Sequence, residues 1–183
     1  LSLLRGVDLR AMETADIEIK LLVSTKQTSA MLTNLLSWAK DQLEGITVHL
    51  SCIFIKETLE HTIDLKTTIA REKGIKLIFC KEEDIKVIAD PDMIQLIVRN
   101  LINNAIKFSM PGSTIEVKIV RDGNRCVTSV TDNGIGISAE KLPYVFSSAN
   151  KGTFGTNNEK GVGLGLKLTK TYTELQNGQI WCT

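Results

Sequence analysis

Two asparagines and a lysine on one segment are the residues of this chain best suited to hold a phosphate and its metal ion. Asn100 and Asn104 are four residues apart, so in a helix they project from the same stripe. An amide costs free energy when it is buried without polar partners, and its oxygen is a neutral ligand suited to Mg²⁺. Lys107 follows about one turn later and could meet phosphate oxygens as a point charge. Taken alone, the asparagines fit hydrogen bonds to neighbouring loops equally well.

Two glycine-rich strings lie downstream, and the first follows an expected hairpin. Residues 115–119 alternate apolar and polar side chains, residues 121–125 make a turn, and the chain runs back to Asp132. At that strand end the Asp132 carboxylate could accept a hydrogen bond from the exocyclic amine of an adenine. Gly134 and Gly136 leave no Cβ where a purine would lie against the backbone. A plain strand-to-loop turn would use the same residue types, because they tolerate positive φ.

The second string leads straight into a predicted helix over residues 163–177. Backbone amides at a helix N-terminus bind anions, and Gly161, Gly163 and Gly165 would let phosphates approach them. The string is not the nucleotide fingerprint of the Rossmann fold, because no strand leads directly into it.

A polar stretch over residues 147–160 precedes this string. It is rich in glycine, threonine and asparagine and can bury little, so we expect a mobile lid over the nucleotide. Lys151 and Lys160 are its candidate phosphate contacts. Either lysine taken singly is better explained as a solvated loop charge.

Together, the three segments resemble the N, G1 and G2 boxes of the sensor histidine kinases of two-component systems. These kinases lie in the ATPase superfamily that also contains DNA gyrase, the heat-shock chaperone and the mismatch-repair ATPases. Residues 143–146 resemble the F box of the same kinases, and the resemblance covers about residues 46–183. It implies that ATP and Mg²⁺ are bound, that Asn104 holds the metal, and that Asn100 and Lys107 complete the catalytic group. The residues it implies for nucleotide binding are Asp132, Gly134, Gly136, Phe146, Lys151, Lys160, Gly161, Gly163, Gly165 and Leu166.

Asn100 distinguishes branches of that superfamily. The hydrolysing members carry a glutamate at this place, one turn before the metal-binding asparagine, where it activates water. Asparagine cannot take up the proton, so efficient hydrolysis is disfavoured and the phosphoryl group is kept for a protein acceptor. A neutral imidazole needs little deprotonation to attack phosphorus, so a histidine acceptor fits such a site.

The region before residue 46 predicts a long helical hairpin. Residues 16–44 read as one helix with a heptad-like apolar stripe, and residues 1–12 read as the end of a preceding helix. In the family this hairpin dimerises and carries the acceptor histidine. The resemblance therefore implies a homodimer through the hairpin and a response-regulator receiver domain as partner. A coiled-coil spacer without a dimer role is the alternative.

The acceptor histidine itself is not recognisable. His49 and His61 lack the sequence context of the family's H box, and both are predicted to be ordinary surface histidines. We therefore interpret the chain as a fragment that begins after the H box, and we expect that it cannot phosphorylate itself. The family continues with further strands beyond residue 183, which predicts a truncated sheet edge.

Composition narrows the function classes. A net charge of +1 gives no drive toward nucleic acid, and no apolar run approaches the length of a membrane span. The four cysteines have no metal-type spacing, and no signal segment is present, which predicts a reducing cytoplasm. A full-length parent could still be anchored in the inner membrane upstream.

The expected architecture is α+β: a helical hairpin over residues 1–45 and a two-layer α/β sandwich over residues 46–183. Its sheet is predicted to be mixed and largely antiparallel, with helices on one face. The strands are expected near residues 47–54, 75–80, 86–89, 114–121, 125–132 and 179–183, and the helices near residues 56–73, 91–108 and 163–177.

The predicted function is the ATP-binding catalytic core of a histidine kinase, which transfers the γ-phosphate to a histidine of the dimerisation helix. One alternative is a nucleotide-binding signalling module without transfer activity. The other is a serine-directed kinase of the anti-sigma-factor type. The intact N, G1 and G2 boxes argue against the first alternative, and the long hairpin argues against the second.

Overall fold

The computed structural model describes residues 45–80, 84–147, 154–157 and 163–183, together with Thr14, Ile17 and Thr25. The chain divides into two compact units, Leu1–Ile46 and Thr47–Thr183. In the first unit Thr14, Ile17 and Thr25 are helical. The predicted hairpin otherwise lies outside the described residues, so the two-domain arrangement stays a prediction.

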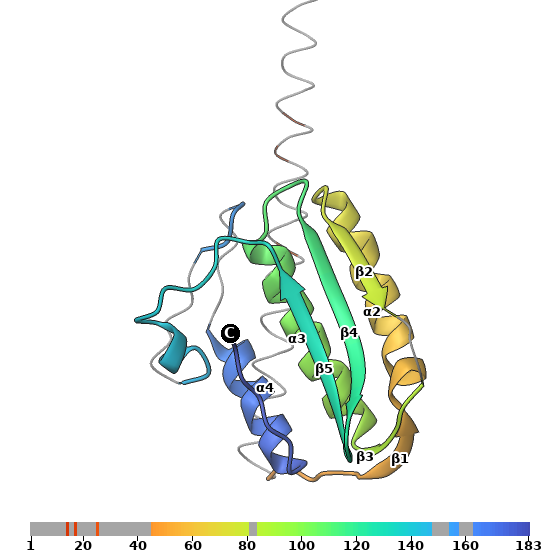
Figure 1. Ribbon diagram of the computed structural model, residues 1–183. Coiled ribbons are helices and arrows are strands. Elements are labelled where there is room, and N and C mark those ends of the chain that lie inside the picture. The colour runs from red at the N-terminus through yellow and green to blue at the C-terminus, as the bar shows by residue number, and fades with distance from the viewer. Residues whose placement is uncertain are drawn as a thin grey trace, which may run out of the picture. The chain divides into compact units, whose positions relative to one another are not determined.

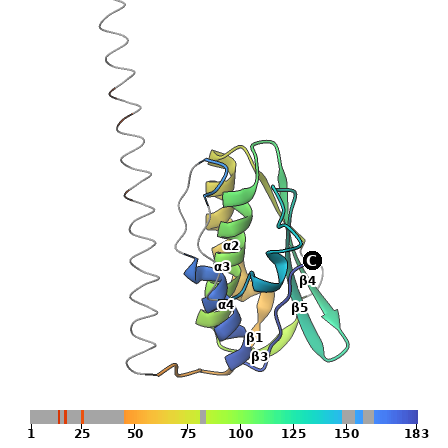
Figure 2. The ribbon, with the colours of Figure 1, turned by 90° about the vertical axis from the view of Figure 1, so that its left-hand side faces the viewer.

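Three α-helices form one layer of the second unit, α2 (Ile55–Glu72), α3 (Pro91–Phe108) and α4 (Leu164–Leu175). Figure 2 shows this layer on one side of the strands, as predicted. A short 3₁₀ turn, η1 (Leu142–Tyr144), lies between the strand β5 (Arg125–Asp132) and α4 in the sequence. The helical layer carries the predicted N box on α3 and the predicted G2 box at the start of α4.

The strands form two sheets in the described part of the chain. A two-stranded sheet pairs β1 (Ser51–Phe54) with β3 (Lys86–Ala89) antiparallel. A three-stranded sheet has the order β2 (Lys76–Cys80), β4 (Thr114–Asp122), β5. Its β2·β4 pairing is parallel and its β4·β5 pairing is antiparallel. This mixed, largely antiparallel α+β sandwich confirms the predicted fold class (Figure 1).

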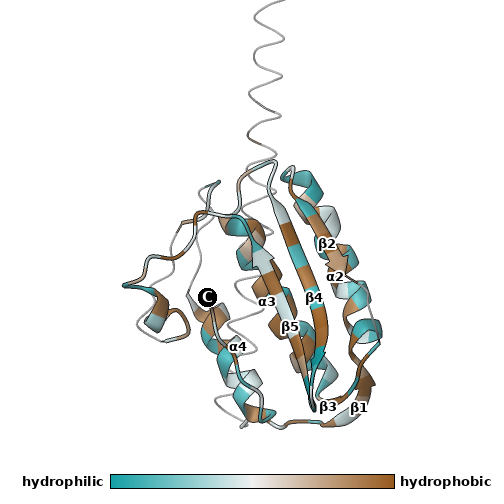
Figure 3. Cartoon of the chain, viewed as in Figure 1, coloured by the Kyte–Doolittle hydropathy of each residue, from teal (hydrophilic) through white to brown (hydrophobic). Residues whose placement is uncertain are grey.

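The core lies between the layers. Along β4 the hydropathy colouring alternates between hydrophobic and hydrophilic residues in Figure 3. Ile115, Val117 and Ile119 are its buried apolar residues. They meet Leu59 and Ile63 of α2, which are also fully buried, and Val98, Ile102 and Ile106 of α3 complete the cluster.

One predicted strand was too long, and another was wrong. Only the last four residues of the expected strand 47–54 pair, because its partner β3 ends at Ala89, just before α3 begins. Residues 179–183 are not a strand, although they lie beside β5 in Figure 1 and Gln179 accepts a 3.1 Å hydrogen bond from Arg125. Trp181 remains 62% exposed, so little apolar burial holds this segment in a ladder.

The buried face of α3 also differs from the apolar stripe that three- and four-residue spacing predicts in the sequence, which consists of Ile94, Ile97, Leu101, Ala105 and Phe108. Ile94, Leu101 and Phe108 are only half-buried, whereas Val98 and Ile102 are fully enclosed. The helix packs against α2, against α4 and against the strands β4 and β5. A single apolar stripe therefore underestimates what it buries.

Candidate functional site

The helix α3 starts where the sequence predicts. The Asp90 Oδ1 atom accepts hydrogen bonds from the backbone amides of Asp92 at 3.0 Å and Met93 at 3.1 Å, and Pro91 occupies the first turn. The other carboxylate oxygen of Asp90 accepts a 2.8 Å bond from the His49 amide. This cap fixes the start of the helix, and with it the positions of the side chains along it.

Asn100 and Asn104 have different surroundings. Asn100 is buried, and its Nδ2 atom donates to the Gly165 carbonyl oxygen at a long 3.4 Å. Asn104, one turn later, is half-buried, and its side chain makes no hydrogen bond to the described residues. Asn100 therefore joins α3 to the start of α4, while the Asn104 amide has the hydrogen-bonding capacity that a ligand requires.

The C-terminal end of α3 binds the first glycine-rich string. The Ile135 amide donates to the Phe108 carbonyl oxygen at 3.1 Å. A Cβ on Gly134 would lie 2.5 Å from that same oxygen, closer than real Cβ atoms come. Gly134 is required by this approach of two backbones, whereas Gly136 is in the left-handed region with φ of 68°.

Two residues that no sequence pattern singles out, Lys73 and Thr156, also contact this end of α3. The Lys73 Nζ atom donates to the carbonyl oxygens of Ile106 at 2.7 Å and Lys107 at 3.1 Å. The amide and hydroxyl of Thr156 donate to the Lys107 carbonyl oxygen at 3.0 and 3.1 Å, and the hydroxyl lies 2.9 Å from the Ser109 carbonyl oxygen. These bonds satisfy carbonyls that a helix end leaves unpaired. The Lys107 Nζ atom lies 4.7 Å from the centre of the Phe108 ring.

Asp132 ends β5, as predicted, and its carboxylate is exposed. Its Oδ1 atom accepts a 2.9 Å bond from the Gly134 amide, which orients the carboxylate. Burial raises the pKa of the Cys182 thiol, and the Asp132 charge raises it further. The segment after α4 therefore places Cys182 near the Asp132 carboxylate.

The start of α4 has the form of an anion site. Gly163 is the N-cap with φ of 79°, and no side chain caps the helix. A Cβ on Gly165 would meet the Asn100 amide group at an ordinary 3.7 Å. The Thr169 hydroxyl donates to the Gly165 carbonyl oxygen at 2.9 Å, and Leu166 is half-buried.

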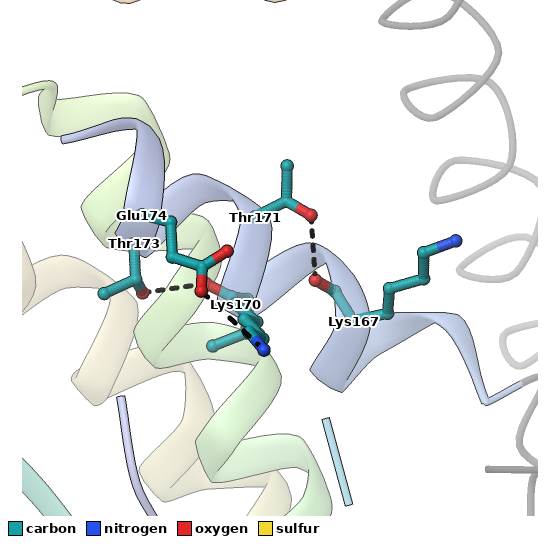
Figure 4. A network of polar contacts seen from close by, with 6 residues as sticks. Lys167, Lys170, Thr171, Thr173 and Glu174 are labelled. Atoms are coloured by element: carbon teal, nitrogen blue, oxygen red, sulfur yellow. Dashed lines mark hydrogen bonds and ion pairs between the residues drawn. The ribbon is translucent and has the colours of Figure 1, made fainter. Parts of the chain in front are cut away.

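Farther along α4, polar side chains bond within the helix (Figure 4). The hydroxyls of Thr171 and Thr173 donate to the carbonyl oxygens four residues earlier at 3.2 and 2.7 Å. The Lys170 Nζ atom lies 3.7 Å from Glu174. None of these contacts involves the backbone amides of the first turn of α4.

The remaining predicted residues are placed only in part. Phe146 is half-buried just after η1, and Val145 beside it is buried. Lys151, Lys160 and Gly161 lie outside the described residues. In the part of the chain that the structure describes, no three His, Cys, Asp or Glu side chains gather as a metal cluster would require. The Asn104 amide is not of these residue types.

The predicted N, G1 and G2 boxes therefore converge on α3, and a family comparison agrees with this geometry. Residues 89–183 match the family described as histidine kinase-, DNA gyrase B- and HSP90-like ATPase. The chain belongs to this ATPase family. Within it the relatives are histidine kinases, so the resemblance inferred from the motifs is confirmed, and the chain contains a histidine kinase ATP-binding catalytic domain.

Two curated relatives illustrate the similarity. The chain is 30% identical over 151 residues to sensor protein KdpD of Clostridium acetobutylicum, which covers 82% of this chain and 17% of that protein. It is 31% identical over 156 residues to the adaptive-response sensory kinase SasA of Crocosphaera subtropica, covering 82% of this chain and 40% of that kinase. The chain thus spans less than half the length of either relative.

Solved structures show the same ATPase fold. The nucleotide-free catalytic domain of histidine kinase ThkA aligns with a TM-score of 0.64 at 26% identity, covering 73% of this chain and 86% of that domain. ThkA in complex with the response regulator TrrA aligns with a TM-score of 0.69 at 22% identity, covering 86% of this chain and 44% of that one.

Among the described residues, no helix is both long and apolar enough to cross a membrane.

Proposed function

We propose that this ATPase domain binds Mg²⁺-ATP and transfers the γ-phosphate to a histidine on a dimerisation helix of the same kinase. The observation that carries the proposal is the convergence of three motifs on α3. Asn100 contacts Gly165 of the G2 box, and Phe108 accepts the Ile135 amide of the G1 box at 3.1 Å. Residues far apart in the sequence thereby surround one helix.

Each motif has a role in this proposal. Asp132, oriented by the Gly134 amide, accepts a hydrogen bond from the adenine amine. The uncapped first turn of α4 binds phosphate oxygens through its amides, and Lys107 adds a positive charge. The half-buried Asn104 amide fits a metal ligand, and Mg²⁺ bound there would neutralise phosphate charge.

The buried Asn100 supports transfer over hydrolysis. Its amide cannot accept a proton from water, and its Nδ2 atom is directed to the Gly165 carbonyl oxygen. Such a site positions ATP without activating water, so the phosphoryl group is transferred to a protein nucleophile and not to water.

The test is phosphotransfer from labelled ATP. The chain of residues 1–183 alone should bind ATP analogues with Mg²⁺ and remain unlabelled, because both of its described histidines, His49 and His61, are exposed outside the motif region. The same chain extended upstream by its natural first helix should acquire acid-labile, alkali-stable phosphate. Labelled His49 or His61, or acid-stable phosphoserine on the extended chain, would contradict the proposal.

We further propose that the kinase is a homodimer that works in the cytoplasm with a response-regulator receiver domain. The heptad-like stripe of residues 16–44 supports the dimer, since burying such a stripe calls for a second chain. Sedimentation of the extended chain should give a dimer. A strict monomer at high concentration would refute it.

A further inference from the structure

A groove of about 610 Å³ runs between α2 and α3. Thr62 and Gln95 face each other across it, with the Thr62 hydroxyl 3.5 Å from the Gln95 Oε1 atom. None of its lining residues belongs to the predicted nucleotide motifs, so the proposed kinase chemistry gives it no role.

The groove carries two cations, and no carboxylate is among its described lining residues. Burial lowers the pKa of Lys66, and the positive charge of Arg99 on the opposite helix lowers it further. Neither cation forms an ion pair with a carboxylate of the described residues, and the groove's described lining contains no Asp or Glu. Two like charges held together without a counter-charge favour an anionic partner.

The same groove exposes apolar side chains. Leu65 is 55% exposed and Ile69 is 43% exposed, and they lie one turn apart on α2. Both are outside the hydrophobic core. A groove between two helices that offers an apolar ridge and flanking charge accepts a third amphipathic helix.

We propose that the α2–α3 groove docks an acidic amphipathic helix of a partner protein. Leucine-type side chains of that helix cover Leu65 and Ile69, and its carboxylates meet Lys66 and Arg99. The groove is then a second binding surface of this kinase domain, separate from the nucleotide motifs.

The probe is a synthetic helical peptide of about 16 residues, with leucine on one face and glutamate on its flanks. Two control peptides replace every glutamate by lysine, or every leucine by serine. Fluorescence anisotropy measures binding to the full chain, and amide chemical shifts locate it. The protein variants are Lys66→Glu combined with Arg99→Glu, Leu65→Ser, and the matched charge control Lys76→Glu, an exposed residue of β2. Circular dichroism verifies that each variant folds.

The glutamate peptide should bind with shifts on α2 and α3, and the two control peptides should bind at least about tenfold more weakly. The double reversal should invert the preference toward the lysine peptide, Leu65→Ser should weaken binding, and Lys76→Glu should change nothing. Equal binding of both charged peptides, or an unchanged preference in the double variant, overturns the proposal. So does self-association of the chain that Leu65→Ser abolishes, because a second copy would then be the occupant. If the double variant fails to fold, Arg99→Gln alone must still weaken the glutamate peptide.

Discussion

Replacing Gly134 by alanine tests how the first glycine-rich string is held against α3. The new Cβ would lie 2.5 Å from the Phe108 carbonyl oxygen and 2.8 Å from the Asp132 Oδ1 atom. Restoring an ordinary 3.4 Å contact requires a backbone shift of roughly 0.9 Å. Such a shift breaks the 3.1 Å bond from Ile135 and the 2.9 Å bond that orients Asp132.

The expected magnitude follows from those two bonds. At about 1 kcal/mol each, their loss lowers the free energy of unfolding by about 2 kcal/mol, which a folded domain survives. If ATP binding requires both bonds in order to position Asp132 for adenine, the variant must restore that geometry at a cost of about 2 kcal/mol. The affinity for ATP then falls by about 30-fold. Isothermal titration calorimetry measures the affinity, and urea denaturation measures the stability.

Gly112→Ala is the matched control. Unlike Gly134, Gly112 has a positive φ, of 86°, but a Cβ there would meet nothing within 4 Å, and the residue is outside the predicted site. It should cost about 1–2 kcal/mol of stability through backbone strain and leave the affinity for ATP unchanged. If Gly134→Ala binds ATP as tightly as the unmodified chain, the account of Gly134 and Asp132 is wrong.

The other predictions concern the two asparagines of α3, the helix cap and an exposed thiol whose pKa is raised. Asn104→Asp should abolish Mg²⁺-dependent nucleotide binding, measured by titration with and without the metal, and normal binding would show that the metal is assigned to the wrong residue. Asn100→Glu should keep some nucleotide binding with at most a modest rise in ATP hydrolysis, because its carboxylate would face the Gly165 carbonyl oxygen. A rise in the hydrolysis rate that approaches the ~10²-fold of a well-placed base would refute this prediction. Asp90→Ala should lower the free energy of unfolding by about 1–3 kcal/mol in urea, since three backbone amides lose their acceptor, and an unchanged midpoint would contradict the cap. Since the pKa of Cys182 is raised, its thiolate fraction at pH 8 is reduced, so iodoacetamide should alkylate it more slowly than a free cysteine. Asp132→Asn should speed the alkylation by lowering that pKa. An identical rate in both proteins would show that the Asp132 charge does not act on Cys182.

Local signals in the sequence predicted the positions of the site elements well. Asp90 and Pro91 mark the start of α3, because capping and a fixed φ act within one turn. The alternation along β4 and the turn at Gly123 bring β5 back to end at Asp132. These features depend on residues that are neighbours in the sequence, so one amino-acid sequence is enough to predict them.

Contacts between distant residues were not predictable in the same way. Lys73 reaches carbonyls 33 and 34 residues away, and no local pattern distinguishes it from a solvated lysine. The steric need for Gly134 appears only when β5 and the end of α3 are placed side by side. Asn100 was grouped with Asn104 by spacing, yet packing of α4 buries Asn100 and leaves Asn104 half-exposed.

The central claim is that the N, G1 and G2 motifs form one Mg²⁺-ATP site. Amide chemical shifts recorded while ATP is titrated into the chain, with and without Mg²⁺, test it most directly. The account predicts saturable binding of one nucleotide, with the largest shifts at Asp132 to Gly136, at Asn104 to Lys107 and at Gly163 to Leu166, and with affinity that depends on Mg²⁺. Absence of saturable binding, or shifts confined to a surface away from these three segments, would contradict it.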